Sequence, residues 1–155
     1  VVLDAPKTSN RLPSFTGDTS RVTFTFRADA DRDYHVWIRG RAFATTKAIE
    51  HDAVILEFPQ AQVTEQPGPN KGKAGGGERA LMNGFMHQPG YAWIGGDADG
   101  KADEIPVAVR FARPGMQVLY LYAYETPVRI DAIWISATQK SRPEASQSGP
   151  AAERK

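Results

Sequence analysis

The sequence predicts an all-β fold, an antiparallel β-sandwich of the jelly-roll kind. Three observations lead to this prediction. Short strand-like segments follow one another at fairly even spacing, Gly, Pro and Asp residues separate them, and no segment has the apolar periodicity of an amphipathic helix. The chain has 155 residues, of which 41% are hydrophobic and 24% charged, and this is the size and composition of a single soluble domain.

The first predicted strand covers 22–27, because its Val and Phe residues alternate with Thr and Arg as in a half-buried strand. An acidic turn at 28–33 leads to a second strand at 34–43, and we expect the two strands to pair as a hairpin. A third strand at 53–58 ends at Pro59, which lacks the amide hydrogen that a ladder needs.

Residues 60–89 are predicted to be a long loop, since Pro, Gly and Lys dominate the middle of this segment. Short strands at 91–94 and 105–111 follow, separated by a Gly- and Asp-rich turn. The last two strands, at 116–123 and 128–135, are apolar on both faces, which is typical of central strands.

The sandwich domain is therefore expected to span 22–138, with an extended N-terminal arm at 1–21 and a polar tail at 139–155. The tail has no large apolar side chain, so it cannot offset the entropy lost on ordering and is expected to need a partner. The first residue is Val1, as in a processed export product, and this favours an extracytoplasmic location, periplasmic or secreted.

Composition argues against several classes of partner. The formal net charge is +1 and the Lys and Arg residues are spread along the chain, so neither nucleic acid nor an anionic membrane is expected to bind. The chain has no Cys, which excludes disulfides and thiolate metal sites. No apolar run approaches the ~20 residues that cross a bilayer, so no transmembrane segment is expected.

Three segments, taken in order, resemble the galactose-binding-like sandwich of bacterial carbohydrate-binding modules. They are YHVWIRGRA at 34–42, DAVILEF at 52–58, and Glu125 together with IDAIWIS at 130–136. In addition, Tyr91-Ala92-Trp93 falls where those modules often carry W-x-W. The resemblance implies a jelly-roll sandwich that binds a polysaccharide or another glycan, with calcium as the one candidate cofactor.

The candidate ligand-binding residues lie near the end of the long loop and combine aromatic rings with polar side chains: Asn83, Phe85, His87, Gln88, Tyr91 and Trp93. Sugar rings stack on aromatic faces while polar side chains bond their hydroxyls, so this mixture favours a glycan site. The alternative is that Tyr91 and Trp93 alternate into the core and the other residues cover the edge of the sandwich. Trp37 and Trp134 are expected to pack between strands.

Acidic residues in the first turn are the candidate metal ligands. Asp29, Asp31 and Asp33 have the spacing of the first half of a calcium loop, although solvated hairpin turns carry the same residues. Asp131 is expected instead to accept hydrogen bonds from a nearby turn or to pair with Arg39 or Arg41, because a buried carboxylate must find donors.

Catalysis is not expected, because the histidines show no paired spacing and the chain has no nucleophile elbow. Two functions remain. The first is a non-catalytic domain that binds a glycan through a loop-borne aromatic face. The alternative is an accessory subunit that docks onto a larger extracytoplasmic or membrane-associated complex, with its loop and termini as contact arms and other envelope subunits as partners.

Overall fold

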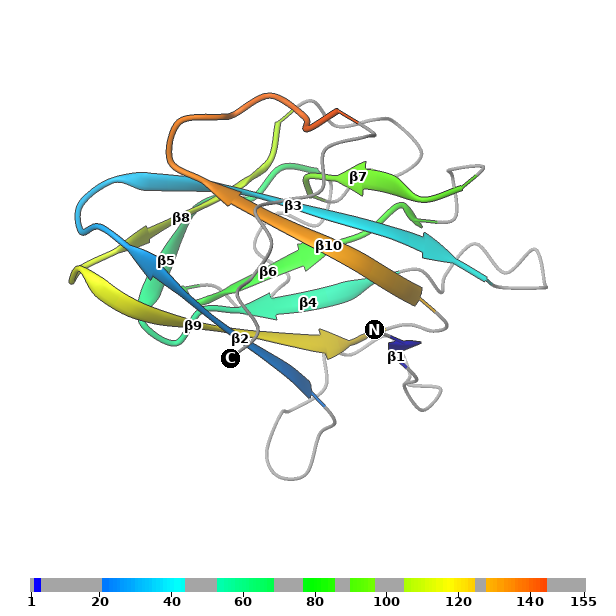
Figure 1. The fold of residues 1–155 in the computed structure, drawn as a ribbon, viewed down its shortest axis with the longest axis horizontal. Helices are drawn as coiled ribbons and strands as arrows, with labels where there is room; N and C mark the ends of the chain where they lie inside the picture. The colour runs from blue at the N-terminus through cyan, green and yellow to red at the C-terminus, as the bar shows by residue number, and fades with distance from the viewer. Residues whose placement is uncertain are drawn as a thin grey trace.

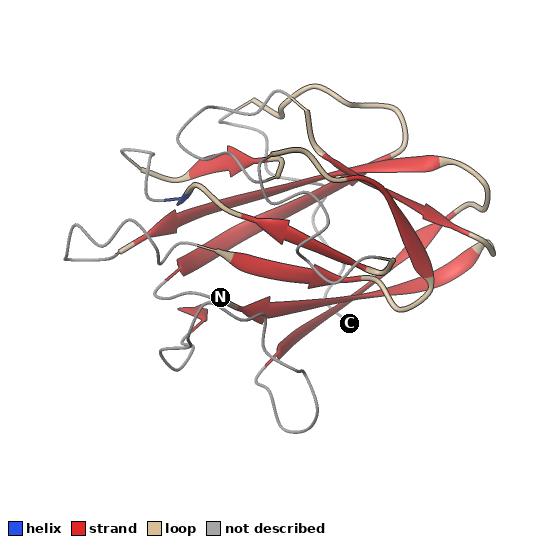
Figure 2. Cartoon of the chain, turned by 180° about the vertical axis from the view of Figure 1, so that it is seen from behind, coloured by secondary structure: helices blue, strands red, loops and turns tan. Residues whose placement is uncertain are grey.

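This computed structural model describes the chain over residues 2–3, 21–43, 53–68, 77–85, 90–96, 105–124 and 128–144. Strands make up almost all of the regular structure in these ranges (Figure 2). In chain order they are β1 (Val2–Leu3), β2 (Arg21–Ala28), β3 (Asp33–Ala42), β4 (Val54–Glu57), β5 (Ala61–Glu65), β6 (Arg79–Met82), β7 (Ala92–Ile94), β8 (Val107–Phe111), β9 (Gly115–Ala123) and β10 (Val128–Ser136). No helix in the described ranges is long and apolar enough to cross a bilayer.

The strands form two antiparallel sheets that pack face to face (Figure 1). Sheet A has the order β1-β10-β3-β8-β5, with β7 also paired to β3, and sheet B has the order β2-β9-β4-β6. The predicted all-β sandwich is therefore confirmed. Every segment predicted as a strand forms one, with bounds shifted by no more than two residues.

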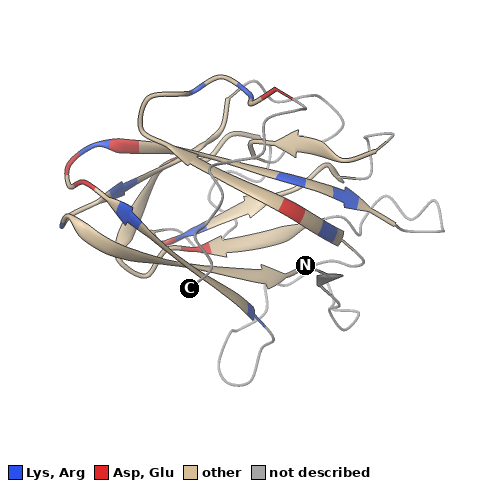
Figure 3. Cartoon of the chain, in the orientation of Figure 1, with Lys and Arg blue, Asp and Glu red and all other residues tan. Residues whose placement is uncertain are grey.

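The core lies between the two sheets and is built from alternate side chains of both. Val36 and Ile38 of β3 and Leu119 and Leu121 of β9 are all fully buried there. Alternation along each strand leaves the other face of each sheet outside this core. Positions of Lys and Arg and positions of Asp and Glu are spread over several strands rather than gathered on one strand (Figure 3).

Phe111, at the end of β8, is the centre of an aromatic cluster in this core. The rings of Phe26 and Tyr34 each lie 5.7 Å from the Phe111 ring, and the Phe58 ring lies 6.4 Å away, all edge to face. Phe26 belongs to sheet B and Tyr34 to sheet A, so the Phe111 ring joins the two layers.

Strands β2 and β3 do not form the hairpin that the sequence predicted. β2 pairs with β9 in sheet B, whereas β3 pairs with strands of sheet A. In the turn between them Asp31 has a φ of 56°, and its amide donates to the carbonyl of Phe111 at 2.9 Å. The turn carries the chain from one sheet to the other, so that the apolar faces of β2 and β3 meet across the core.

The long loop predicted at 60–89 is wrong for two segments, which form β5 and β6. β5 extends sheet A along β8, and β6 extends sheet B along β4. Between them the buried Gln66 side chain holds the backbone of Leu81, donating to its carbonyl and accepting from its amide at 3.0 Å each. Both strands are short, and in β5 Val63 is the one large apolar side chain, so their alternation is too brief to predict a strand.

Residues 137–144, here called the C-terminal strap, run back across the outer face of sheet A and are drawn in orange at the top of Figure 1. The indole N–H of Trp93 donates to the carbonyl of Glu144 at 3.1 Å. The ammonium group of Lys140 lies 3.2 Å from the carboxylate of Glu65 on β5. The strap is therefore attached to two strands of sheet A besides β10.

Parts of both predicted terminal segments belong to the folded domain. β1, within the predicted arm, pairs with the start of β10. Residues 139–144 of the predicted tail lie in the strap. The remainder of the arm up to residue 20, and residues 145–155 of the tail, lie outside the described residues.

Candidate functional site: the groove between the sheets

A groove of about 570 Å³ opens along one side of the sandwich, between β2 of sheet B and β10 of sheet A. We call it the seam groove. Most of its lining is aromatic or aliphatic, and its residues are Phe24, Thr25, Phe26, Arg27, Tyr34, Leu119, Ile133, Trp134, Ile135 and Ser136. Its volume lies within the ~300–1,000 Å³ that is usual for ligand sites.

The alternation of β2 and β10 explains why the groove is apolar. Phe24 and Phe26 of β2, and Ile133 and Ile135 of β10, point toward the core but are only partly buried. β2 is the outermost strand of sheet B, and beyond its first residues β10 is outermost in sheet A. Between two central strands these side chains would be buried in the core. Because β2 and β10 are edge strands, the same side chains line an open groove.

The strand edges beside the groove are unpaired within the described residues. β2 pairs with β9 on one side only. β10 pairs with β3 on one side, and on the other side β1 covers only Val128 and Arg129. Alternate amide and carbonyl groups along 132–136 therefore point outward from sheet A with no ladder partner in the described ranges, as they do along β2.

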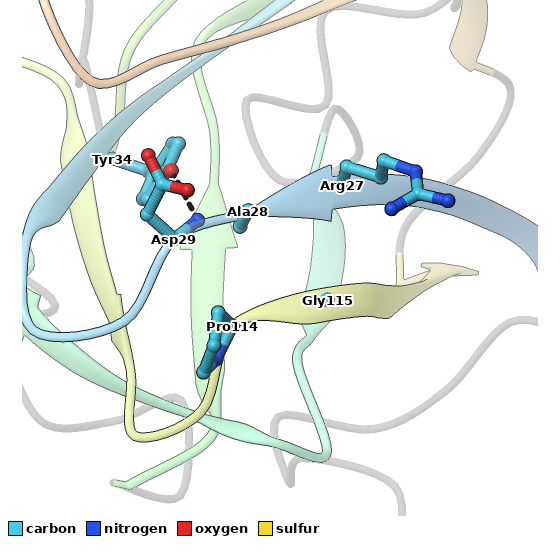
Figure 4. Close-up of a pocket in the computed structure, with 6 residues that line it drawn as sticks. All are labelled: Arg27, Ala28, Asp29, Tyr34, Pro114 and Gly115. Carbon is cyan, nitrogen blue, oxygen red and sulfur yellow. Dashed lines mark hydrogen bonds between the residues drawn. The ribbon is translucent and has the colours of Figure 1, made fainter.

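A second hollow of about 380 Å³, the end pocket, adjoins the groove where β2 ends (Figure 4). The two hollows share Arg27 and Tyr34 in their linings. The amide of Asp29 donates to the hydroxyl oxygen of Tyr34 at 2.7 Å, and the carboxylate of Asp29 lies 3.3 Å from the guanidinium of Arg32. The polar groups on this side of the pocket thus already have partners.

Arg27 differs from these groups. It is exposed, and its guanidinium has no carboxylate partner among the residues that the structure describes. In Figure 4 its side chain points along β2, away from Asp29. Among the described residues that line the two hollows, Arg27 is the one cation.

Two of the six predicted ligand-binding residues are buried, so the expected exposed aromatic face is wrong for them. Phe85 is fully buried, and a Cβ added to Gly40 would lie 2.8 Å from its ring. Trp93 is 3% exposed beneath the strap, and the Arg39 guanidinium lies 5.5 Å from its ring centre. Neither ring presents a face on which a sugar could stack, because Phe85 packs in the core against Gly40 and the strap covers Trp93.

Of the other four predicted residues, the structure describes two, Asn83 and Tyr91. Asn83 is half-buried, and its side-chain oxygen accepts from the amide of Gly84 at 2.7 Å. Tyr91 is 44% exposed. His87 and Gln88 lie outside the described residues.

The acidic turn does not gather its carboxylates as the calcium prediction requires. Asp29 is turned toward Arg32, while Asp33 accepts from the guanidinium of Arg110 at 2.9 Å. This bond from Arg110 is the main cause that lowers the pKa of Asp33. In the ranges that the structure covers, no three His, Asp or Glu side chains form a group that could hold a metal ion.

Two structural predictions about β10 are met. Asp131 is paired with Arg39, with one carboxylate oxygen 2.8 Å from Nε and the other 3.1 Å from Nη2. Trp134 lies opposite Trp37 in the ladder, and the Trp37 side chain is fully buried. Asp131 is a paired side chain at the surface rather than a buried one, since 40% of it is exposed.

Sequence reasoning missed the residues that line the seam groove. The strand at 22–27 was expected to be half-buried, and Phe24 and Phe26 are indeed partly buried. The strand at 128–135 was expected to be a central strand instead, because nothing in one strand shows which neighbour is absent. The available signal was the pair of large rings, Phe24 and Phe26, on a strand that alternates strictly with polar residues. Large apolar side chains on a strand at the edge of a sheet indicate a surface that another segment covers.

The fold and the groove define the class of this protein, a two-sheet antiparallel β-sandwich with an open seam. No family model, curated protein or solved structure matches the chain.

Proposed function

We propose that the chain is a non-catalytic docking domain that takes an extended segment of a partner protein into the seam groove as an added strand. The observation that carries this proposal is the pair of unpaired strand edges on either side of an apolar groove. Docking was the second of the two functions expected from the sequence. Two features of the described residues support docking over glycan binding. The seam groove can hold an extended chain, and Phe85 and Trp93, two of the rings predicted to bind a sugar, are buried.

The chemistry of the groove limits what can fill it. Phe24, Phe26 and Ile133 can pack against apolar side chains of a ligand. The outward amide and carbonyl groups of β10 can form hydrogen bonds with donors and acceptors that are spaced as in a β-strand. An extended peptide supplies both, because its backbone pairs with an edge while alternate side chains enter the groove. We expect a glycan to need more polar side chains than this lining has, since seven of its ten residues are aromatic or aliphatic.

The expected affinity is moderate. Each apolar side chain that leaves water completely contributes about 1.5–3 kcal/mol, and a short segment places about three such side chains in the groove. Part of this free energy is lost to ordering the peptide and to association itself. We therefore expect a short isolated peptide to bind with a Kd of about 1–100 µM.

A synthetic peptide of about eight residues in which Val and Thr alternate is the probe that tests strand addition. Tryptophan fluorescence reports the titration, since Trp134 lines the groove. A peptide of the same composition with paired Val-Val and Thr-Thr steps should bind at least about tenfold more weakly, because only strict alternation places every Val on one face. Methylation of alternate backbone nitrogens supplies a second test: one set of positions should abolish binding and the other should have little effect.

The matched variants are Ile135→Thr, which places a hydroxyl in the groove, and Val22→Thr, which makes a similar change on β2 outside its lining. Ile135→Thr should weaken peptide binding and Val22→Thr should leave it unchanged, once urea unfolding has shown both variants to be folded. Equal binding of alternating and paired peptides, or equal tolerance of both methylated sets, would refute strand addition. A response to soluble glycans with none to either peptide would favour the glycan function instead.

A further inference from the structure

We infer that the docked segment carries an acidic side chain at one end of its apolar run, and that Arg27 binds this carboxylate. The inference rests on the docking function proposed above. It adds a charge requirement to the apolar alternation that the groove itself selects.

Within the described residues, the charged side chains that line the two hollows are those of Arg27 and Asp29. Asp29 already faces Arg32 at 3.3 Å. Arg27 has no ion pair within the described ranges and points away from Asp29 (Figure 4). The charge left for a ligand to neutralise is therefore positive, and a guanidinium matches the geometry of a carboxylate through paired hydrogen bonds.

Two side-chain acceptors in the lining of the groove are already engaged. The Tyr34 hydroxyl oxygen accepts from the amide of Asp29, and the Ser136 hydroxyl oxygen accepts from two amides of the strap, at 3.2 Å and 3.0 Å. Among the described residues of the lining, Arg27 is the charged donor that has no ion-pair partner. A ligand that brings an acceptor to Arg27 gains a bond without displacing one that exists.

The position of Arg27 makes the requirement directional. It lies at the end of β2, between the seam groove and the end pocket, while Phe24 lies farther back along the same strand. A strand in the groove has one end beside Arg27 and the other end remote from it. An acidic residue should therefore strengthen binding at one end of the peptide only.

The test uses the alternating peptide with neutral capped ends and with Asp at its first or its last position, each compared with the Asn version. One of the two Asp peptides should bind wild-type protein about three- to tenfold more tightly than its Asn version, and the other should show no preference. The preference should shrink as the salt concentration rises from about 0.05 M to about 0.5 M.

Arg27→Ala should abolish the preference and Arg27→Lys should keep part of it. Arg113→Ala is the matched control, because it removes an exposed arginine that lines a separate hollow at the turn between β8 and β9. It should leave the preference intact. Equal gains at both ends, or loss of the preference in Arg113→Ala, would show a general attraction of charge and overturn the inference. Equal binding of Asp and Asn peptides would also overturn it, while leaving the docking function standing. Failure of every peptide to bind would remove the docking function itself.

Discussion

Replacing Phe111 by Leu tests whether the aromatic cluster joins the two sheets. Phe111 makes three edge-to-face ring contacts, with Phe26, Tyr34 and Phe58. Each such contact is worth about 0.5–1.5 kcal/mol beyond the area that it buries. Leucine restores part of the lost contact, so we expect the free energy of unfolding to fall by about 1.5–3 kcal/mol, and by about 3–5 kcal/mol for Phe111→Ala.

Phe58→Leu is the matched control, since its ring has one of these contacts rather than three. Urea unfolding followed by circular dichroism gives both values, and an unchanged slope with denaturant would show that the same surface is exposed in each variant. Phe111→Leu should cost about 1 kcal/mol or more beyond Phe58→Leu, as two further ring contacts require. Equal costs for the two variants would refute the central role of Phe111.

Two further predictions concern the strap and the pH dependence of stability. Trp93→Phe removes the hydrogen bond to Glu144, worth about 0.5–1.5 kcal/mol, so amide exchange should speed up in the strap and stay unchanged in sheet B; no change in the strap would contradict the anchoring role. The hydrogen bond from Arg110 lowers the pKa of Asp33, so just below pH 4 the native protein binds fewer protons than the unfolded chain. The stability that Asp33 contributes is therefore present above this pH range and is lost as the pH falls through it. Asp33→Asn should therefore make the loss of stability below about pH 4 less steep; unfolding curves that remain parallel to those of the wild-type protein would count against the pairing.

Local pattern predicted seven of the ten strands in the described residues, all except β1, β5 and β6, but it did not predict which strands are neighbours. The alternation of Phe24 and Phe26 with polar residues places one face of β2 on a core whatever sheet it joins. It cannot tell whether β2 pairs with the next strand or crosses to the other sheet, and the expected hairpin with β3 was wrong for this reason. The acidic turn suits either connection, because a single residue at positive φ supports several turn geometries.

The seam groove was harder to predict because it depends on the absence of a neighbouring strand beside β2 and beside most of β10, in the described residues. β10 is apolar on both faces, as a central strand is, yet from Ala132 to Ser136 it has no ladder on its outer side in the described structure. The aromatic residues near the end of the long loop misled because their place at a loop-to-strand junction suggested exposure. Phe85 instead packs against Gly40 of β3, and the strap covers Trp93.

The most direct measurement of the central claim is residue-resolved amide hydrogen exchange of β2 and β10, with and without the alternating peptide. We expect alternate amides along 132–136 to exchange quickly in the free protein and to become protected when the peptide binds, while the amides paired with β3 stay slow throughout. Protection of these outward amides in the free protein, or exchange that saturating peptide does not change, would contradict the claim that the seam accepts a strand.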